Sequence, residues 1–472
     1  MCRPAGRATQ GRPSIFRTGR GLRPLPLSTP EWYHTVLLRF STLHPEKRVR
    51  HYLVFREYLR GAALVWWLSI NIHSVWAQDW PQFRGPTGQG LSEAVDLPLT
   101  WSETENVAWK IQIPGRGWSS PVVLENKIWL TTGVAGGRSL QGGHSLRAVG
   151  IDLDSGRFLH DVEVFRLEGA PSLHEKNTSA SPTPILEEGR VYVHFGTFGT
   201  AALDSHGKTL WKSRRFRYTE QYGPGGTPAL GEDLLVVSCD GTDKQFVAAL
   251  DKNNGKVRWK TCREDGDMAY STPLVIRSEG LQQVVSTGGN QAVSYELSSG
   301  KKLWWIRYRG FSQVPRPLFA HGLVYLVNPA GEGPPILYAV CPQGRGNVSD
   351  SHVVWTWQRG VPVTPSPLIV GDEIYFVSDN GILTCLDARD GRQYWRERLG
   401  GNFSASPAYA DGKIFFLSEE GKTTVIKPGS HFEKLAENQL DGRTLASIAI
   451  VDRSILIRSD THLYRIEKIT AP

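Results

Sequence analysis

A short motif ending in proline recurs seven times between residues 119 and 407. The copies are Ser119–Pro121, Ala180–Pro182, Gly226–Pro228, Ser271–Pro273, Pro315–Pro317, Pro365–Pro367 and Ala405–Pro407. Consecutive prolines are 40 to 61 residues apart, and a copy without proline, Leu445–Ser447, ends 40 residues after Pro407. Self-similarity at such a period indicates one supersecondary unit copied eight times, not several independent domains.

Each repeat contains short apolar runs separated by polar turns that hold glycine. In one repeat, Ile374–Val377 is followed by the turn Asp379–Gly381 and then by a run that ends at Asp387. Such runs, punctuated by Asp-Gly or Asn-Gly, predict β-hairpins. Four strands in about 40–50 residues is the period of a propeller blade. The sequence therefore predicts an all-β, eight-bladed β-propeller of four-stranded blades.

The last strand of each repeat carries the most regular pattern, Asp-x-x-x-Gly-x-x-x-Trp. It is complete in Asp251–Trp259 and Asp387–Trp395. The glycine is expected to supply the positive φ of a tight turn, and the tryptophan to fill the wedge between neighbouring blades. The structural residues of this pattern and its weaker copies are Trp109, Trp211, Trp259, Trp304, Trp395, Gly207, Gly255, Gly300 and Gly391.

The two ends of the repeat array complement each other. The last repeat, Leu445–Ile466, supplies only three strands, whereas Asn106–Ile113 resembles a spare fourth strand with its tryptophan. We expect this N-terminal strand to complete the eighth blade, which closes the ring and removes its open edges. The propeller is thus predicted to be a single domain over residues 106–467. Residues 78–105 form an N-terminal extension, of which Asp79–Thr100 is expected to lie across one blade.

Residues 1–77 resemble a leader for export. Arg56 and Arg60 precede the apolar run Gly61–Ile70, and Val75–Ala77 supplies small residues for cleavage, as in a secretory signal peptide. Residues 1–50 are long for the basic part of such a peptide and are interpreted as sequence upstream of the true start. An uncleaved anchor is the alternative, although the run is short for a membrane span. The mature chain is expected to lack a transmembrane span and to be periplasmic or at the cell surface.

The net charge of +8 belongs mostly to this leader. Residues 1–77 hold 12 Lys or Arg and 3 Asp or Glu, which leaves 42 basic and 43 acidic residues in the body. A nucleic-acid partner, which requires a basic face on the folded domain, is therefore not expected. The body's cysteines, Cys239, Cys262, Cys341 and Cys385, have neither disulfide-like pairing nor zinc-site spacing and are interpreted as isolated small residues.

The repeat resembles that of pyrroloquinoline-quinone (PQQ) propellers, specifically the secreted bacterial proteins with PQQ-like repeats. Trp80–Pro86 also resembles the start of that group, and the likeness covers about residues 79–467. It implies the fold strongly and the function weakly, because two branches share the repeat. One branch is the quinoprotein dehydrogenases, and the other is the BamB-like assembly factor that scaffolds β-barrel insertion without catalysis.

The dehydrogenase branch implies a pair of adjacent cysteines, Glu, Asn and Asp ligands for Ca²⁺, and an Asp base. The chain has no adjacent cysteines, and the ligands cannot be placed. Asp240–Asp243 and Asp379–Gly381 have suitable ligand types but stand where each repeat has a hairpin turn. Motifs of serine hydrolases, zinc proteases and nucleotide-binding loops are also absent. We therefore predict no catalytic residue, no metal and no cofactor; PQQ with Ca²⁺ belongs to the alternative function.

Loops that enter the innermost strands of a propeller gather around its channel and are the expected place for a site. The candidate binding residues on these loops are Arg116, Trp118, Lys176, Asn177, Tyr222, Tyr270, Arg316, Asn402 and Arg443. Arginine and aromatic residues are favoured at protein interfaces. These side chains could also hold an anionic or sugar-like ligand, or simply cap strands and fill the channel.

The favoured function is a non-catalytic binding or scaffolding platform, monomeric, whose partner is a protein or another component of the cell envelope. A quinoprotein oxidoreductase is the first alternative, and a carbohydrate- or polymer-binding module is the second. A pair of buried carboxylates facing the channel would favour the oxidoreductase. Exposed aromatic residues together with Asn or Asp would favour the carbohydrate-binding module.

Overall fold

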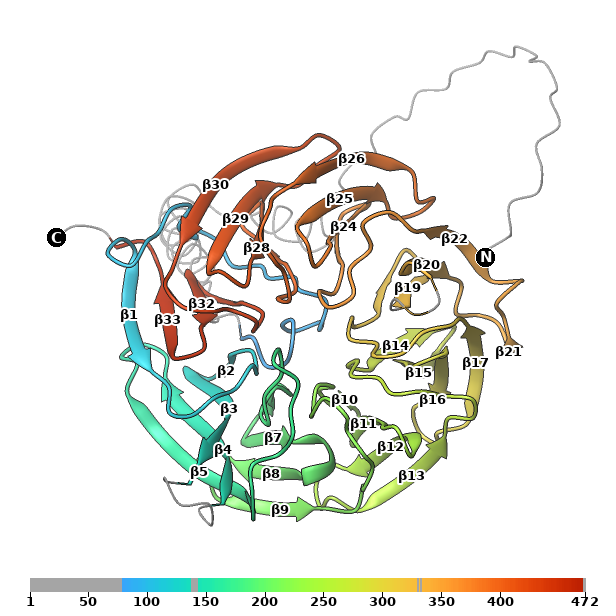
Figure 1. Ribbon diagram of the computed structural model, residues 1–472, viewed down its shortest axis with the longest axis horizontal. Coiled ribbons are helices and arrows are strands. Elements are labelled where there is room, and N and C mark those ends of the chain that lie inside the picture. The colour runs from blue at the N-terminus through green and yellow to red at the C-terminus, as the bar shows by residue number, and fades with distance from the viewer. Residues whose placement is uncertain (1–78, 137–142, 329–330, 332, 470–472) are drawn as a thin grey trace, which may run out of the picture. The chain divides into compact units, whose positions relative to one another are not determined.

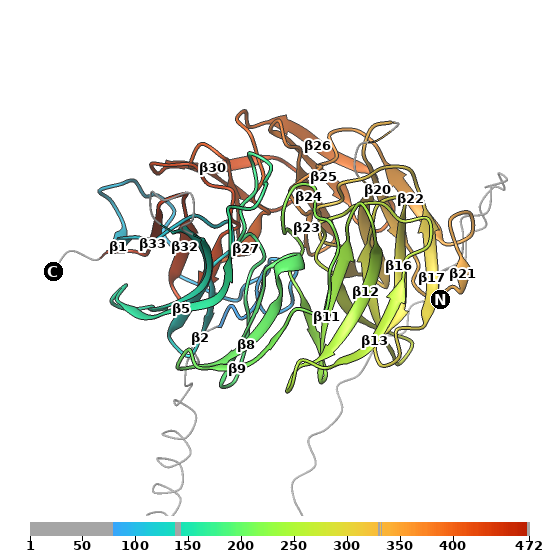
Figure 2. The ribbon, with the colours of Figure 1, turned by 60° about the horizontal axis from the view of Figure 1, so that its bottom comes forward.

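The computed structural model describes residues 79–136, 143–328, 331 and 333–469. In this part of the chain, eight β-sheets are arranged as blades around a central axis, as Figure 1 shows. The strands of each blade run side by side between the two faces of the ring (Figure 2). The predicted eight-bladed, all-β propeller is confirmed. The predicted leader, residues 1–77, lies outside the described residues.

The first four blades follow one another along the chain. Blade 1 contains β2 (Val122–Leu124), β3 (Lys127–Ala135), β4 (His144–Asp152) and β5 (Phe158–Leu167). Blade 2 contains β6 (Ile185–Glu187), β7 (Arg190–His194), the short 3₁₀ helix η1 (Gly196–Phe198), β8 (Thr200–Asp204) and β9 (Thr209–Ser213). Blade 3 contains β10 (Ala229–Gly231), β11 (Leu234–Asp240), β12 (Gln245–Asp251) and β13 (Val257–Cys262). Blade 4 contains β14 (Leu274–Ser278), β15 (Leu281–Thr287), β16 (Gln291–Glu296) and β17 (Lys302–Arg307).

The remaining blades complete the ring. Blade 5 contains β18 (Leu318–Ala320), β19 (Leu323–Asn328), β20 (Ile336–Val340) and β22 (Val353–Trp357). Blade 6 contains β23 (Leu368–Val370), β24 (Glu373–Val377), β25 (Ile382–Asp387) and β26 (Gln393–Arg398). Blade 7 contains β27 (Ala408–Ala410), β28 (Lys413–Leu417), β29 (Lys422–Lys427) and β30 (Glu433–Gln439). Blade 8 contains β31 (Ala449–Val451), β32 (Ser454–Arg458), β33 (His462–Ile466) and β1 (Val107–Gln112).

Blade 8 joins the two ends of the array in the way the sequence predicts. β1 pairs antiparallel with β33, so that Val107 lies opposite Ile466 and Ile111 opposite Leu463. In Figure 1 the blue strand β1 lies beside the red strand β33. The strand from the N-terminal side thus supplies the outer strand that the last repeat lacks, and the ring closes without an open blade.

Blade 4 departs from the predicted four strands. A two-residue strand from the loop of blade 5, β21 (Gly346–Asn347), pairs in parallel with β17, with Gly346 opposite Trp304. The backbone N–H of Val348 also donates to the carbonyl of Trp305. This loop covers part of the outer edge of blade 4, an edge that would otherwise expose unpaired backbone groups.

The repeated tryptophans link neighbouring blades by hydrogen bonds as well as by packing. The indole N–H of Trp259 on blade 3 donates to the carbonyl of Leu297 on blade 4 at 2.8 Å. Equivalent bonds join Trp109 to Leu153, Trp211 to Lys252, Trp355 to Ala388 and Trp395 to Gly429. Trp304 differs only in its hydrogen bond: it is fully buried in a cluster that joins residues of blades 4 and 5, as predicted, but its indole N–H donates to Gln283 within blade 4.

The repeated glycines receive these tryptophans, which explains the spacing of the pattern. The predicted positive φ is present at all four positions, namely Gly207, Gly255, Gly300 and Gly391. At Gly300 a Cβ atom would stand 2.5 Å from the Trp259 ring of the preceding blade. The glycine therefore meets two requirements at once, the turn conformation and the close approach of the neighbouring blade.

Substituting Gly300 with alanine is expected to destabilise the propeller more than substituting Gly280. Gly280 has a similar φ, +78° against +71°, but a Cβ added there would have no neighbour within 4 Å among the described residues. Gly280→Ala should cost about 1 kcal/mol for the left-handed conformation alone. Gly300→Ala should cost about 1–3 kcal/mol more, because the added methyl overpacks the interface with Trp259. Urea unfolding of the two variants measures this difference, and equal midpoints would contradict it.

The anchor of blade 2 lies two residues further along the chain than predicted. β6 begins at Ile185, directly after Pro184, just as β2 begins at Val122 directly after Pro121. The true anchor is therefore Thr183-Pro184 and not Ala180–Pro182. The segment Ser181-Pro-Thr-Pro184 contains two candidate pairs in succession, and only the pairing with the other blades distinguishes them.

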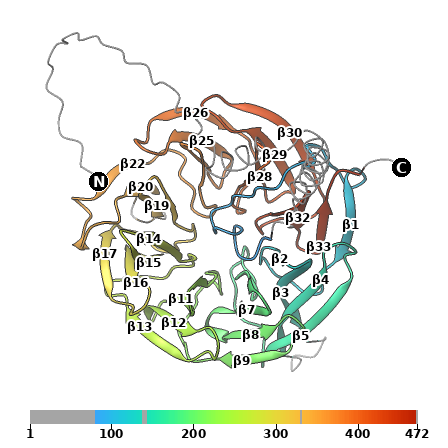
Figure 3. The same ribbon diagram turned by 180° about the vertical axis from the view of Figure 1, so that it is seen from behind.

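The N-terminal extension does not lie across one blade, as predicted, but crosses the centre of the ring. Figure 3, which views the ring from behind, shows this blue segment passing over the axis. Its backbone and side-chain contacts reach blades 1, 2, 5, 6 and 7: Trp80 with Val123, Pro81 with Leu186, Phe83 with Arg316, Arg84 with Pro367, and Leu91 with Tyr409. Trp80 also packs in the core cluster that contains β1 and blade 8. The extension closes one end of the channel.

Two other sequence predictions can be compared with the described residues. Cys239, Cys341 and Cys385 are buried and Cys262 is exposed, and no disulfide joins these four residues. Within the described part of the chain, the structure has no helix with the length and apolar character that a membrane crossing requires.

Candidate functional site

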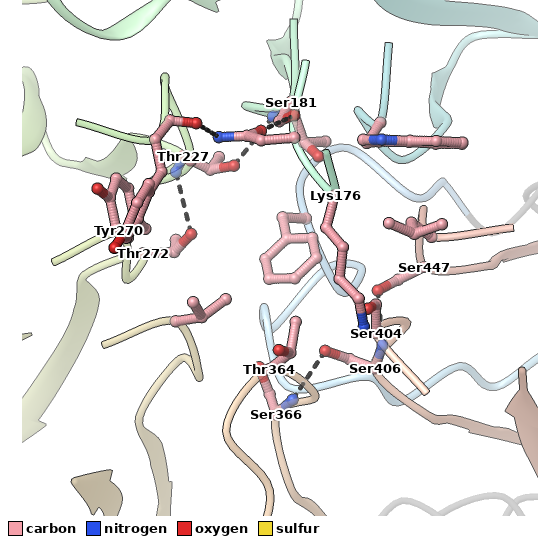
Figure 4. Close-up of a pocket in the computed structure, with 18 of the residues that line it drawn as sticks. Lys176, Ser181, Thr227, Tyr270, Thr272, Thr364, Ser366, Ser404, Ser406 and Ser447 are labelled. Atoms are coloured by element: carbon pink, nitrogen blue, oxygen red, sulfur yellow. Dashed lines mark hydrogen bonds between the residues drawn. The ribbon is translucent and has the colours of Figure 1, made fainter. Parts of the chain in front are cut away.

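The central channel contains a pocket of about 470 Å³. The end of the channel that lies away from the extension is called its open end. Phe83 of the extension is among the pocket's lining residues, together with side chains from all eight blades and the loops between them. In Figure 4, Tyr270 and Thr272 lie on one side of the pocket and Ser404, Ser406 and Ser447 on the other. A volume of this size suits a small-molecule ligand or an inserted side-chain cluster.

A belt of hydroxyl groups surrounds the pocket and joins the blades. In each link, the backbone N–H of one blade's anchor donates to the hydroxyl oxygen of the next blade's anchor. The six links are Ser120 to Thr183, Thr183 to Thr227, Thr227 to Thr272, Arg316 to Ser366, Ser366 to Ser406 and Ser406 to Ser447, all at 2.9–3.1 Å. The residue before the anchor proline is thus a connecting residue between blades. Blade 5 is the exception, since it carries Arg316 at this position.

Aromatic side chains gather at the open end of the pocket. His174 and Tyr222 meet at a ring distance of 5.3 Å, and Tyr222 contacts Tyr270 at 6.0 Å. The side-chain amide of Asn177 donates to the carbonyl of Tyr222 at 2.7 Å, which holds two loops together. Phe311 is 43% exposed beside them. The rim therefore presents rings that are partly free to contact a partner or ligand.

Lys176 reaches across the pocket and is held by a buried carboxylate. Its Nζ donates to Glu419 at 2.8 Å, and Figure 4 shows the side chain pointing toward Ser404. Arg443 and Ser404 bond the same carboxylate, at 3.1 and 2.6 Å. Burial acts to raise the pKa of Glu419, but the hydrogen bonds from Lys176, Ser404 and Arg443 outweigh it and hold the pKa below its ordinary value. The loop that carries Lys176 is thereby fastened to the other side of the channel.

The predicted binding residues fall into three groups. Trp118, Lys176, Asn177, Tyr222 and Tyr270 line the pocket. Arg116, Asn402 and Arg443 lie on the surrounding loops, where Asn402 bonds Glu420 and Arg443 bonds Glu419. Arg316 does not reach the open end: it is buried on the side of the extension and donates to the carbonyl of Phe83 at 2.9 Å. Their binding roles stay predictions.

The sequence interpretation missed the belt, Glu419 and Arg84. The belt could have been found from the Ser or Thr that precedes the proline in most anchors. A single anchor, however, indicates only the start of a strand. No local sequence pattern identifies Glu419 or Arg84, because each makes its contacts with segments that lie far away in the sequence.

The acidic turns considered as metal ligands are structural. Asp240 forms a fully buried, two-bonded ion pair with Arg263, at 2.9 and 3.1 Å. Asp243 accepts from the backbone N–H of Thr219, and Asp379 from that of Val363. Among the described residues, no three His, Cys, Asp or Glu side chains are grouped so as to hold a metal ion.

A buried carboxyl group lies under the aromatic rim. Glu220 accepts hydrogen bonds from the hydroxyl of Tyr218 at 2.8 Å and from the backbone N–H of Thr197 at 3.2 Å. Burial raises the pKa of Glu220 from 4.5 to about 7, against the effect of these two bonds. It precedes Tyr222 by two residues, so its protonation affects the loop that forms the rim.

Glu220→Gln is expected to flatten the pH dependence of stability. Because the folded pKa lies above the unfolded one, the native state binds the proton more tightly. The free energy of unfolding therefore contains a contribution that is lost as pH rises from about 4.5 to about 7. A shift of this size corresponds to about 3 kcal/mol. The difference between the two proteins' urea unfolding curves, measured from pH 4.5 to 8, isolates Glu220; a difference that is constant with pH would contradict the expectation.

Comparisons with known proteins agree with the fold and find likenesses to two kinds of protein. A family model described as outer membrane protein assembly factor BamB matches residues 243–365 and 336–445. The BamB of Shewanella oneidensis is 23% identical over 288 residues, covering 56% of this chain and 68% of its own length. The BamB of Yersinia pestis is 24% identical over 235 residues, covering 47% of this chain and 55% of its own.

Solved structures extend the likeness to nearly the whole ring. The crystal structure of BamB from Moraxella catarrhalis superposes with a TM-score of 0.53, covering 76% of this chain and 99% of that one. Quinohemoprotein alcohol dehydrogenase from Comamonas testosteroni gives 0.60, covering 84% and 82%. Both are 11% identical to this chain, so these two likenesses concern the fold. The chain thus resembles BamB in sequence over part of its length and shares the propeller fold with both solved structures.

Proposed function

We propose that this BamB-like propeller is a non-catalytic scaffold of the cell envelope, which binds proteins of outer-membrane assembly at the open face of its channel. The class of partner is suggested by the name of the BamB relatives, which are described as outer membrane protein assembly factors. In the same proposal the protein acts in the periplasm, where such partners are reached. The proposal that the protein is not catalytic rests on the kinds of side chain that line the channel.

Among the described residues, those that line the pocket do not include Asp, Glu or Cys. Carboxylates of Asp or Glu usually balance the charge of a protein-bound Ca²⁺, and the described lining offers only uncharged oxygen atoms. The carboxylate nearest in the hydrogen-bond network, Glu419, is already held by Lys176, Ser404 and Arg443. These residues do not fit a PQQ–Ca²⁺ site, which supports a scaffold over the quinoprotein alternative.

The open face has the composition of a protein interface. The partly exposed aromatic residues His174, Tyr222 and Phe311 line the pocket, and Arg116 is exposed on the loop that leads into β2. Aromatic and arginine side chains at the centre of an interface contribute most of the binding free energy. Phe311 is the most direct candidate, since it is exposed without a visible structural reason.

The experiment captures partners by cross-linking the tagged full chain in the envelope of its source organism. We expect outer-membrane assembly proteins to be recovered, with at least tenfold less recovery for Phe311→Asp. Phe158→Asp, which alters an equally exposed phenylalanine on the outer strand of blade 1, is the matched control. Equal recovery by both variants would reject the open face as the interface.

A titration with PQQ and Ca²⁺ tests the alternative function separately. A ligand that binds the folded state raises the melting temperature by mass action. We expect no rise that depends on Ca²⁺ and no change in quinone absorbance, whereas a Ca²⁺-dependent rise accompanied by such a change would overturn the non-catalytic proposal.

A further inference from the structure

The hydroxyl belt leaves a ring of hydrogen-bond donors directed at the channel. Thr183, Thr227, Thr272, Ser366, Ser406 and Ser447 each use the hydroxyl oxygen to accept a backbone N–H from the preceding blade. Each hydroxyl therefore keeps its own proton to donate. Within the described residues these six protons have no protein acceptor, although all six side chains are buried and line the pocket. A ligand rich in acceptors would satisfy them.

Two buried arginines lie behind the lining of the pocket, on the side of the extension: neither is a lining residue, but Phe83 of the extension is one and accepts a hydrogen bond from Arg316. Arg84 of the extension is 2% exposed, and Arg316 of blade 5 is 3% exposed. Arg84 donates from Nη2 to the carbonyl of Pro367 at 2.6 Å, and Arg316 from Nη1 to that of Phe83 at 2.9 Å. In the described chain, Nε and Nη1 of Arg84 and Nε of Arg316 have no partner, and no carboxylate is among the groups that influence either guanidinium.

The two buried cations lie close enough for the charge of Arg316 to act on Arg84. Burial lowers the pKa of Arg84 to about 9, with a further lowering by the nearby charge of Arg316. Burial lowers the pKa of Arg316 to about 10. Burying an ion without a counter-charge is unfavourable, so the site favours an anion that would supply one. A third buried guanidinium, Arg458, is bonded by Ser119 and Thr131 and adds to the positive potential around the channel.

Arg316 also breaks the pattern of the belt. In the other seven blades the equivalent anchor residue is Ser or Thr, which lines the pocket or forms a hydrogen bond with the anchor of a neighbouring blade. A residue that departs from an otherwise consistent pattern, at a cost in packing and electrostatics, indicates a functional requirement. Gly88 of the extension lies against this guanidinium, where a Cβ would come within 2.3 Å of Nη1, so the extension is shaped around it.

We propose that the channel binds an oxyanion group, the phosphate, sulfate or carboxylate of a small ligand. The anion accepts hydrogen bonds from the belt hydroxyls, while the guanidinium groups of Arg84 and Arg316 balance its charge from behind the lining. The pocket above has room for the rest of an organic ligand. This binding is independent of the protein partner at the open face.

The test measures binding of inorganic phosphate to the purified full chain by calorimetry at constant ionic strength. We expect saturable binding of phosphate and of sulfate, and none of glucose, which offers hydroxyls without charge. Glucose 6-phosphate distinguishes the source of the group: tighter binding than phosphate indicates an organic ligand, and equal binding indicates a free anion. Absence of saturable phosphate binding, or equal binding of glucose, would overturn the proposal.

Variants at Arg316 separate charge from structure. Arg316→Ser restores the hydroxyl that the other blades carry, so it should fold, and we expect phosphate affinity to fall at least tenfold. Arg316→Lys keeps the charge and should stay within a few-fold of the parent. Arg398→Ser, an exposed arginine on the outer strand of blade 6, is the matched control and should change nothing. Equal affinities of Arg316→Ser and Arg398→Ser would reject the site.

Discussion

Arg263→Met is expected to lower the free energy of unfolding by about 3–5 kcal/mol. Arg263 and Asp240 are both fully buried and share two hydrogen bonds, and Arg263 also bonds the hydroxyl of Ser286 on blade 4. Removing the guanidinium leaves a carboxylate buried without compensation. The pair also positions the segment leading to Tyr270, because the N–H of Ala269 donates to the carbonyl of Asp240.

Urea unfolding followed by tryptophan fluorescence measures this loss. Arg258→Met is the matched control on the same strand, since Arg258 is half exposed and its pair with Asp251 should contribute less than about 1 kcal/mol. Replacing both buried partners, as in Arg263→Met with Asp240→Leu, should recover much of the stability, because no charge stays buried. A small loss for Arg263→Met alone would show that water reaches the pair.

Trp80→Ala is expected to cost about 3–5 kcal/mol and to loosen the extension from the ring. Trp80 is completely buried, bridges to Val123 through its backbone, and packs in the cluster that holds Leu97, Trp101 and blade 8. The ring of Trp80 lies against Gly85, where a Cβ would come within 2.6 Å. The substitution therefore removes the side chain that fixes the start of the extension.

Limited proteolysis of Trp80→Ala should cut within residues 79–105 before the blades, alongside a lower urea midpoint. Trp357→Ala is the control, because Trp357 lies on the outer strand β22, is only partly buried, and should cost much less. If the two variants had equal midpoints and equal cleavage patterns, the extension would not be anchored by Trp80.

The fold could be predicted because its determinants are local and repeated. Gly255 indicates a turn because its backbone has a positive φ. Trp259 indicates a contact with the next blade because so large a side chain needs a neighbouring surface to pack against. Errors arose where the local sequence allowed two interpretations, as at Ser181-Pro-Thr-Pro184. Trp304 satisfies the pattern in sequence, but Gln283 offers its indole a partner inside the same blade. Such a choice depends on packing that no short motif specifies.

The candidate site was predictable only in part, for a related reason. Trp118, Tyr222 and Tyr270 stand on loops that enter innermost strands, so the fold alone brings them to the axis. Arg316 was identified from its loop but placed at the wrong end of the channel, because its side chain turns toward Phe83, 233 residues away. The path of the extension, and therefore Arg84, follows from no periodic pattern. Its contacts exist only once several separate blades have been assembled.

The strand that closes the ring also sets the order of events in folding. β1 cannot pair until β33 exists, and Trp101 cannot bond Asn438 until 337 further residues are present. Contacts of such high sequence separation carry a large loop-closure entropy and slow the folding of β-proteins. Until the last strands emerge, the apolar surface of Trp80 and Trp101 and the free edges of blades 1 and 7 stay exposed to aggregation. A newly made chain must therefore be kept from premature association until synthesis is nearly finished, and a truncation of only the final strand should prevent folding of the whole.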